Sequence, residues 1–96
     1  MILEQAILNV LPGQTDKFEF AFKQAQQIIS GMPGYIDHEL QQCVENPDQY
    51  LLLVRWETLE DHTVGFRGSG EYLKWKELLH HFYNPFPKVE HYTRIF

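Results

Sequence analysis

Residues 50–56 read Tyr-Leu-Leu-Leu-Val-Arg-Trp, a hydrophobic run without the alternation of apolar and polar residues that marks a half-buried strand. Successive side chains of a strand point to opposite faces, so this segment is apolar on both faces. A strand of that kind has to be covered on both faces. We therefore predict a strand at residues 50–56 that is packed on both sides.

The preceding segment, residues 35–43, alternates and predicts another strand. Its even-numbered residues, His38 among them, share one face, and its odd-numbered residues from Tyr35 to Cys43 share the other. A turn is predicted between the two strands, because turn-favouring residues stand there, namely Asn46, Pro47 and Asp48.

Toward the N-terminus, residues 2–10 are apolar and compatible with a strand, which Pro12 and Gly13 end. In the next segment the hydrophobic period lengthens to that of an amphipathic helix, with a stripe formed by Phe18, Phe22, Ala25 and Ile29. Gly31 and Pro33 then predict the C-terminal end of this helix.

Toward the C-terminus, Thr58 is a suitable N-cap for a helix whose inward stripe consists of Leu59, His62, Thr63 and Phe66. Glycines interrupt this helix. Ser69 is placed to cap a second helical segment, whose inward stripe consists of Tyr72, Trp75, Leu79 and Phe82. A last strand is predicted from Val89 to Phe96.

The predicted order is strand, helix, strand, strand, helix, strand, within a single domain at residues 1–96. This is the β-α-β-β-α-β order of a ferredoxin-like α+β fold with a four-stranded antiparallel sheet. Two helices cover only one face of such a sheet. Because the strand at residues 50–56 needs cover on its other face, we expect the chain to form a homodimer through that face, about a two-fold axis.

Composition argues against several classes of protein. Eight Lys and Arg residues against 13 Asp and Glu residues leave a formal net charge of −5, and the basic residues form no patch that tracks phosphates, so we expect no nucleic-acid partner. No apolar run approaches the roughly 18 residues that span a bilayer, so we expect no membrane association.

The single cysteine, Cys43, cannot form an internal disulfide, and the first residues lack a signal-peptide pattern. We therefore expect Met1 to be the natural start of a cytoplasmic protein.

Residues 54–62 read Val-Arg-Trp-Glu-Thr-Leu-Glu-Asp-His and, with the following Gly65, Phe66, Arg67 and Ser69, resemble a known family. Three further segments agree with it: Pro12-Gly13, Pro33-Gly34-Tyr35 and Val89-Glu90-His91-Tyr92. The chain is similar over nearly its whole length to the antibiotic biosynthesis monooxygenase domain family. The resemblance implies a dimeric ferredoxin-like protein. The family includes cofactor-independent monooxygenases of quinols and polycyclic phenols, haem-degrading enzymes, and isomerases of small oxygenated metabolites.

The haem-degrading branch of this family carries an Asn on the first strand and a Trp and a His on the second helix. Alignment at Pro12-Gly13 and at Ser69 places Ala6, Phe66 and Lys76 at these positions. The three departures argue against haem degradation.

The resemblance favours monooxygenation of a small aromatic or quinol-like substrate without metal or flavin, in a pocket between the sheet and the helices. Such a reaction needs a base that ionises the phenol or quinol, because the anion reduces O₂ far more readily than the neutral form. It also needs hydrogen-bond donors for the oxyanion and apolar, aromatic walls that hold the reacting pair.

His62 is the candidate base, because it lies on the inward stripe and an imidazole titrates near the working pH. The adjacent helix N-terminus predicts a pKa at or below about 6.5 for this residue. The alternative is a core-edge histidine that donates to a backbone carbonyl and takes no part in chemistry. His38, on the apolar face of its strand, is a candidate for lining the same cavity or the dimer interface.

Four further residues are candidates for substrate binding. Arg67 offers a fixed fork of donors for an oxyanion or a carboxylate, and its alternative role is a structural salt bridge, for example with Glu57 or Glu71. Phe66, Tyr72 and Trp75 either form the walls around a flat ring or belong to the ordinary core.

The five histidines do not predict a metal site. His80 and His81 are adjacent, hence about 100° apart on a helix, and no pair of histidines is spaced i, i+4. Two other functions stay open on the same fold: a non-catalytic dimer that binds a small hydrophobic metabolite, and an isomerase.

Overall fold

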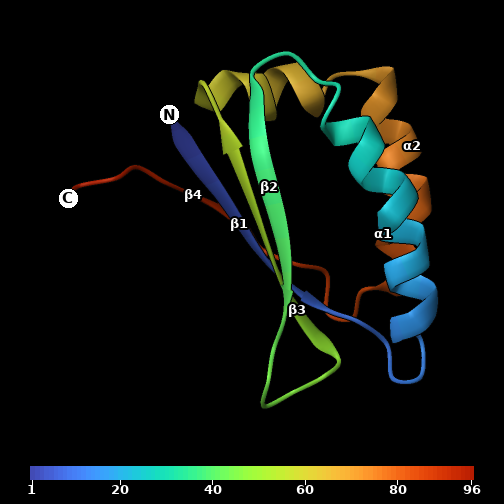
Figure 1. Cartoon of the computed structure of the whole chain (residues 1–96). Coiled ribbons are helices and arrows are strands. Elements are labelled where there is room, and N and C mark those ends of the chain that lie inside the picture. Colours follow the sequence, from blue (N-terminus) through green and yellow to red (C-terminus); the bar gives the residue numbers. More distant parts are fainter.

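The predicted order of strands and helices is confirmed by a computed structural model that describes residues 1–96 (Figure 1). The strands are β1 (Ile2–Asn9), β2 (Tyr35–Gln42), β3 (Gln49–Trp56) and β4 (Val89–Tyr92). The two α-helices are α1 (Thr15–Ile29) and α2 (Gly70–Leu79). A π-helix, η1 (Asp61–Phe66), precedes α2, and a 3-10 helix, η2 (His80–Phe82), follows it.

The strands form one antiparallel sheet in the order β2-β3-β1-β4. Strands β1 and β3 pair along their whole length, from Ile2 opposite Trp56 to Asn9 opposite Gln49. Both α-helices lie on one face of the sheet, and the other face is open (Figure 1). The chain therefore has the ferredoxin-like α+β fold that its sequence predicts.

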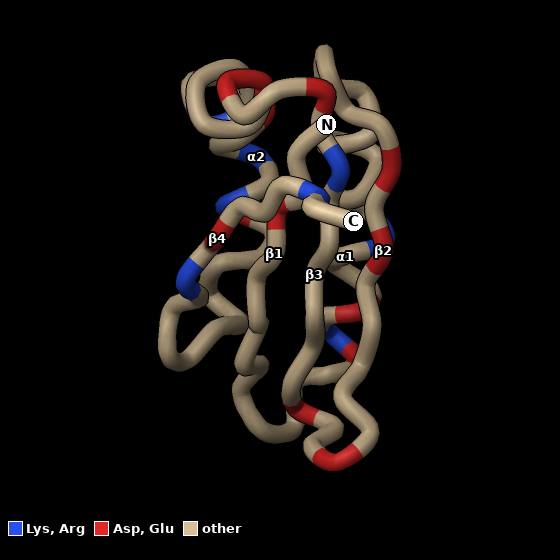
Figure 2. The backbone as a smooth tube through the Cα atoms, turned by 90° about the vertical axis from the view of Figure 1, so that its left-hand side faces the viewer, with Lys and Arg blue, Asp and Glu red and all other residues tan.

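The core lies between the sheet and the helices. All four residues of the stripe predicted for α1 are buried, namely Phe18, Phe22, Ala25 and Ile29. The even-numbered residues of β3 are also buried and face the helices: Tyr50, Leu52, Val54 and Trp56. The odd-numbered residues Leu51, Leu53 and Arg55 are only half-buried, on the open face. Figure 2 views this open face and shows few charged residues along its central strands β1 and β3.

Strand β2 departs from the strict alternation that its sequence predicts. The pairing with β3 is irregular between Tyr35 and Asp37, so one residue is added to the β2 side of the ladder. Tyr35 is thereby opposite Trp56, and His38 is opposite Val54, so both lie on the helix-facing side. The prediction that Tyr35 and His38 occupy opposite faces is wrong for this reason.

Strand β4 is shorter than predicted. It ends at Tyr92, which is opposite Leu3, whereas the sequence predicts a strand as far as Phe96. Continuation of the same register would bring Thr93 opposite Ile2, the first residue of β1. The remaining C-terminal residues have no strand beside them to pair with.

The helices on the C-terminal side begin at their predicted caps. Ser69 accepts a hydrogen bond from the Tyr72 N–H at 3.2 Å. Thr58 and Asp61 exchange side-chain to backbone hydrogen bonds at the start of η1. The π-helical character of η1 is not predicted by the spacing of its residues, although His62 and Phe66 face inward as expected. No helix is both long and apolar enough to traverse a bilayer.

Candidate active site

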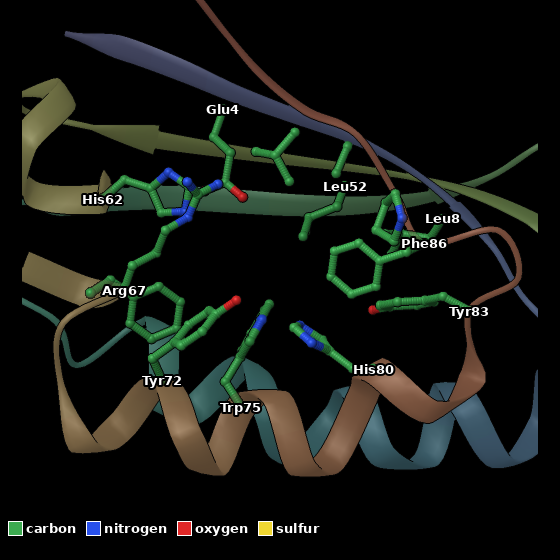
Figure 3. A pocket seen from close by; sticks show the side chains of 14 residues that line it. Glu4, Leu8, Leu52, His62, Arg67, Tyr72, Trp75, His80, Tyr83 and Phe86 are labelled. Carbon is green, nitrogen blue, oxygen red and sulfur yellow. The ribbon is translucent and has the colours of Figure 1, made fainter. Parts of the chain in front are cut away.

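A cavity of about 370 Å³ lies between the sheet, helix α2 and the loop after η2. This volume is at the lower end of the range of small-molecule sites, which is roughly 300–1,000 Å³. Figure 3 shows side chains that enter the cavity from the strands on one side and from α2 on the other. Its walls are mainly hydrophobic and aromatic, and its apolar part includes Ala6, Leu8, Leu52, Phe66, Tyr72, Trp75, Tyr83, Phe86, Pro87 and Val89.

Two buried polar side chains lie at one end of the cavity. Glu4 is 5% exposed and His62 is 3% exposed, and they are the only buried polar or charged residues of the chain. The Oε1 atom of Glu4 accepts a 2.9 Å hydrogen bond from the indole Nε1–H of Trp56. It also lies 3.4 Å from Nε2 of His62, whose ring stacks on that of Trp56. The cavity thus combines apolar walls with one proton-exchanging end.

Strand geometry explains how an acid comes to lie in this core. Glu4, Ala6 and Leu8 alternate along β1, so all three point toward the helices. Sequence reasoning missed Glu4 as a site residue. A charged residue on the face that also carries Ala6, Leu8 and Val10 was the available indication.

His62 makes its second contact with a residue of the edge strand. Its Nδ1 atom lies 2.7 Å from Nε2 of His91, which stands opposite Glu4 in the pairing of β1 with β4. One of these two nitrogens carries the shared proton and the other accepts it. His91 is half-buried. It was also missed, because nothing local in the sequence indicates that residue 91 meets residue 62.

Burial sets the protonation of this end of the cavity. It raises the pKa of Glu4 to about 7, while the hydrogen bond from Trp56 and the charge of Arg67 oppose the increase. Burial also lowers the pKa of His62 to about 3, and the nearby Arg67 and His91 lower it further. The direction for His62 is the one expected from sequence, but the main cause is burial rather than a helix N-terminus. In neutral solution His62 is therefore a neutral imidazole, and the group that titrates near pH 7 is Glu4.

Arg67 lines the same end of the cavity. It follows η1 directly, and Figure 3 shows its side chain extending toward Glu4 and His62. It takes part in none of the ion pairs of the structure. Of the two partners considered for it, Glu71 pairs with Lys74 instead and Glu57 forms no ion pair. Its guanidinium therefore retains donors for a ligand.

Three aromatic residues predicted as substrate walls do line the cavity. Phe66 packs edge-on against both Tyr72 and Trp75, with ring centroids 5.3 Å and 5.6 Å apart. Phe66 and Trp75 also belong to the buried core. Figure 3 places Tyr72, Trp75 and His80 along the α2 side of the cavity, with Tyr83 and Phe86 at its far end. His80, Tyr83 and Phe86 were not anticipated, because the loop that carries two of them has no hydrophobic period.

His38 is not among the residues that line this cavity. Its Nδ1 atom lies 2.5 Å from the Tyr35 hydroxyl, and its Nε2 atom lies 3.0 Å from Oε1 of Gln26 on α1. Both ring nitrogens are thus engaged near the far edge of the sheet. Five of the six residues predicted from sequence come together around the cavity, and His38 lies apart from them.

A second, more open hollow of about 700 Å³ lies on the outer surface of the helices, between Phe20 and Ile28 of α1 and Leu78 of α2. None of the buried titratable residues lines it. The structure also brings no three His, Cys, Asp or Glu side chains into an arrangement that suits a metal ion. The cavity beside Glu4 is therefore the candidate active site.

Comparison with known sequences gives one family and a near relative. The sequence model of the family described as antibiotic biosynthesis monooxygenase matches residues 1–78. YczJ, an uncharacterized protein of Bacillus subtilis (strain 168), is 61% identical over 95 residues, which are 99% of this chain and 100% of YczJ.

Comparison with solved structures agrees with these matches. A Bordetella bronchiseptica protein that carries the same family name is 32% identical, with a TM-score of 0.94 and coverage of 99% of this chain and 97% of that one. SnoaB, a cofactor-independent oxygenase from Streptomyces nogalater, has a TM-score of 0.78 at 16% identity and covers 99% of this chain and 93% of its own. At that identity the likeness to SnoaB shows the fold alone.

Proposed function

The chain belongs to the antibiotic biosynthesis monooxygenase family, and on this premise we propose that it is a cofactor-independent monooxygenase of a small aromatic or quinol-like substrate. The observation that carries the proposal is the titratable Glu4–His62 pair at one end of an aromatic cavity of about 370 Å³. SnoaB, which has the same fold, is a cofactor-independent oxygenase, and this supports the general kind of reaction.

The reaction begins with the loss of a proton. Removal of the hydroxyl proton of a hydroquinone gives an anion that transfers an electron to O₂, and the resulting radical pair then forms a carbon–oxygen bond. Elimination of water from the hydroperoxide completes the reaction. One oxygen atom enters the ring and the other leaves as water. The hydroquinone loses four electrons and becomes a hydroxyquinone, and O₂ gains the same four.

The lining of the cavity suits each requirement of this reaction. The Glu4–His62 pair supplies a proton acceptor, and the Arg67 guanidinium supplies donors for the oxyanion. Phe66, Tyr72 and Trp75 provide apolar walls that hold a flat ring and keep water from the radical pair. We assign His38 no role in this cavity.

Oxygen uptake tests the proposal. The protein, treated with a chelator and free of flavin, is given a panel of hydroquinones and phenols under ¹⁸O₂. We expect substrate-dependent uptake and one ¹⁸O atom in the product. Arg67→Gln should slow this turnover by roughly tenfold or more, since a lost charge-assisted hydrogen bond is worth about 1.5–3 kcal/mol. Arg94→Gln, on the exposed C-terminal segment, is the matched control.

The other functions open to this fold give different results in the same experiment. Ligand binding without oxygen uptake would identify a non-catalytic binder and would contradict the proposal. A product isomeric with the substrate and free of ¹⁸O would identify an isomerase. Loss of activity on chelation would contradict a reaction that needs no metal.

We also propose that the protein works as a cytoplasmic homodimer, joined through the open face of the sheet. The apolar residues of that face support this assembly, because Ile7 is 43% exposed in the single chain and Leu3, Leu51 and Leu53 are only half-buried beside it. The single cysteine supports a reducing compartment.

A further inference from the structure

We propose that Glu4 is the group that takes the substrate's proton, and that His62 and His91 form a relay that carries this proton from the buried cavity to the edge of the sheet. The role toward substrate rests on the proposed function. The relay is a property of the chain itself and can be examined without substrate.

The geometry of three side chains from three elements carries this inference. Glu4 on β1 lies 3.4 Å from Nε2 of His62 on η1, and Nδ1 of His62 lies 2.7 Å from Nε2 of His91 on β4. Glu4 and His62 are almost fully buried, whereas His91 is half-buried on an edge strand. The three groups thus lead from the cavity toward solvent.

The hydrogen bonding of His62 distinguishes a relay from a purely structural histidine. A structural core-edge histidine typically donates to a backbone carbonyl. Both nitrogens of His62 instead face groups that exchange protons, Glu4 on one side and His91 on the other. The second partner of Glu4, the Trp56 indole, donates only and holds the carboxyl group in place. Figure 3 shows the carboxyl group of Glu4 directed toward the cavity.

The proton balance of the relay is simple. Glu4 receives the hydroxyl proton of the substrate and passes a proton to Nε2 of His62. His62 gives its Nδ1 proton to Nε2 of His91, and His91 gives its own Nδ1 proton to water. One proton enters and one leaves. The transfer starts from the Nδ1–H tautomers of both imidazoles, which protonated Glu4 favours, and it ends in the Nε2–H tautomers, which ionised Glu4 favours. Both rings therefore return to the Nδ1–H tautomer before Glu4 passes on the next proton. The same steps in reverse return a proton for the elimination of water.

The charges around the relay favour neutral imidazoles. Burial lowers the pKa of both His62 and His91, and the charge of Arg67, which follows η1, lowers both further. Burial raises the pKa of Glu4, and Arg67 opposes that rise. From α2 and the loop beyond it, Tyr72, His80 and Tyr83 face the same cavity, and burial lowers the pKa of His80 and raises that of Tyr83. Glu4 is the one carboxyl group among the residues that line the cavity.

Nitrogen NMR of the substrate-free protein tests the relay directly. Long-range ¹H–¹⁵N spectra of ¹⁵N-histidine protein report the tautomers of His62 and His91 as a function of pH. When Glu4 is ionised, His62 should donate from Nε2 and accept at Nδ1. When Glu4 is protonated, both rings should switch, at one common midpoint near the Glu4 pKa of about 7.

Two variants give this measurement its control. Glu4→Gln keeps the shape of the side chain and an oxygen acceptor for Trp56, but it should abolish the joint switch. Glu90 lies on the same edge strand as His91, and its side chain is half-exposed. The variant Glu90→Gln should therefore leave the switch intact. The relay would be overturned if the tautomers of His62 and His91 did not change with pH. It would also be overturned if Glu4→Gln showed the same joint switch as the wild type.

Turnover tests the role of Glu4 toward substrate. Glu4→Gln should lose about 10²–10⁴-fold in kcat, the usual contribution of a general base. His91→Asn should slow turnover and should regain activity when imidazole is added, whereas His81→Asn, on the exposed surface, should do neither. Melting curves confirm that each variant is folded.

The two proposals fail in different ways. If the wild-type protein turns substrate over and Glu4→Gln does so at the same rate, Glu4 is not the proton acceptor. The monooxygenase proposal would still stand. The absence of oxygen uptake with every hydroquinone would overturn the monooxygenase proposal, while a joint tautomer switch in the NMR spectra would still support the relay.

Discussion

The indole of Trp56 and the carboxyl group of Glu4 join the two central strands through a buried 2.9 Å hydrogen bond. Residue 56 ends β3 and residue 4 lies near the start of β1, so 52 positions separate the pair in sequence. Trp56 is fully buried, and its N–H has no other acceptor among the hydrogen bonds of the structure. The bond therefore fixes the position of the acid at the end of the cavity.

Replacement of Trp56 should change the titration of Glu4. The hydrogen bond from Trp56 lowers the pKa of Glu4, so Trp56→Phe should raise that pKa above its present value of about 7. The variant should also lose roughly 1.5–3 kcal/mol of stability, the typical worth of a hydrogen bond to a charged group, in addition to the effect of lost packing. Carboxyl ¹³C shifts of labelled glutamate measure the pKa, and urea unfolding measures the stability. A Glu4 pKa that falls or stays constant would contradict the assignment.

The buried acid should make the pH dependence of stability unusual. Glu4 has a pKa of about 7 in the folded chain against an ordinary 4.5, so folding favours its protonated form. This contribution to stability is fully present below pH 4.5 and is lost as the pH rises through 7. His62 acts in the opposite sense, because its pKa falls from 6.5 to about 3 on folding, and stability is lost as the pH falls through this range.

Glu4→Gln separates these two contributions. Relative to the wild type, the variant should gain up to about 3 kcal/mol of stability between pH 5 and pH 8, at about 1.4 kcal/mol for each unit of pKa shift. Urea unfolding at intervals across this range measures the difference. Glu90→Gln should follow the wild-type curve, because its side chain is half-exposed. Parallel curves for Glu4→Gln and wild type would show that Glu4 titrates normally.

The two faces of β3 should respond differently to a charge. Leu53 lies on the open face, so Leu53→Asp should leave the chain folded and dissociate the proposed homodimer. Leu52 is 4% exposed beneath the helices, and Leu52→Asp should unfold the chain, because an unpaired buried charge costs several kcal/mol of a total stability of roughly 5–15 kcal/mol. Sedimentation velocity and circular dichroism measure the two effects. A wild-type protein that sediments as a folded monomer at micromolar concentration would refute the dimer.

Gly34 should tolerate no side chain, because of its contact with the start of η1. Its φ is +82°, and a methyl group there would overlap the carboxylate of Asp61, which precedes His62. Gly34→Ala should lose at least about 1–2 kcal/mol from the left-handed backbone alone, and more from displacement of Asp61. Gly70→Ala, with open space around its Cα and a negative φ, is the control and should be neutral or stabilising. Equal melting temperatures for the two variants would contradict this account.

Haem should not be degraded by this protein. Ala6 and Phe66 are buried apolar residues of the cavity, and Lys76 is exposed on α2, so these positions carry none of the Asn, Trp and His side chains of the haem-degrading branch. Haem with a reductant, in the presence of catalase, should keep its Soret band. Formation of a ring-opened product under these conditions would show that other residues of the cavity can support that reaction.

Local patterns of residues predict most of this fold. The stripe of α1, the cap at Ser69 and the strand at residues 50–56 each depend on neighbours only a few positions away, and each of these local features is found as expected. The bulge in β2 and the early end of β4 were not predicted, because both follow from where a partner strand lies rather than from the strand's own sequence. The choice between the two faces of β3 was likewise open until the helices were placed.

The residues of the candidate site likewise fall into those that local sequence predicts and those that only the tertiary structure reveals. The inward spacing of His62, Phe66, Tyr72 and Trp75 is a property of single helical segments, so the sequence by itself determined that these side chains share a face. Only the tertiary structure decided that Glu4 and His91 complete the site and that His38 does not. The antiparallel pairing of β1 with β4 brings residues 4 and 91 opposite each other, beneath His62. Burial among these elements then shifts the pKa values of Glu4 and His62, because desolvation depends on every atom packed around a charge and on no local sequence pattern.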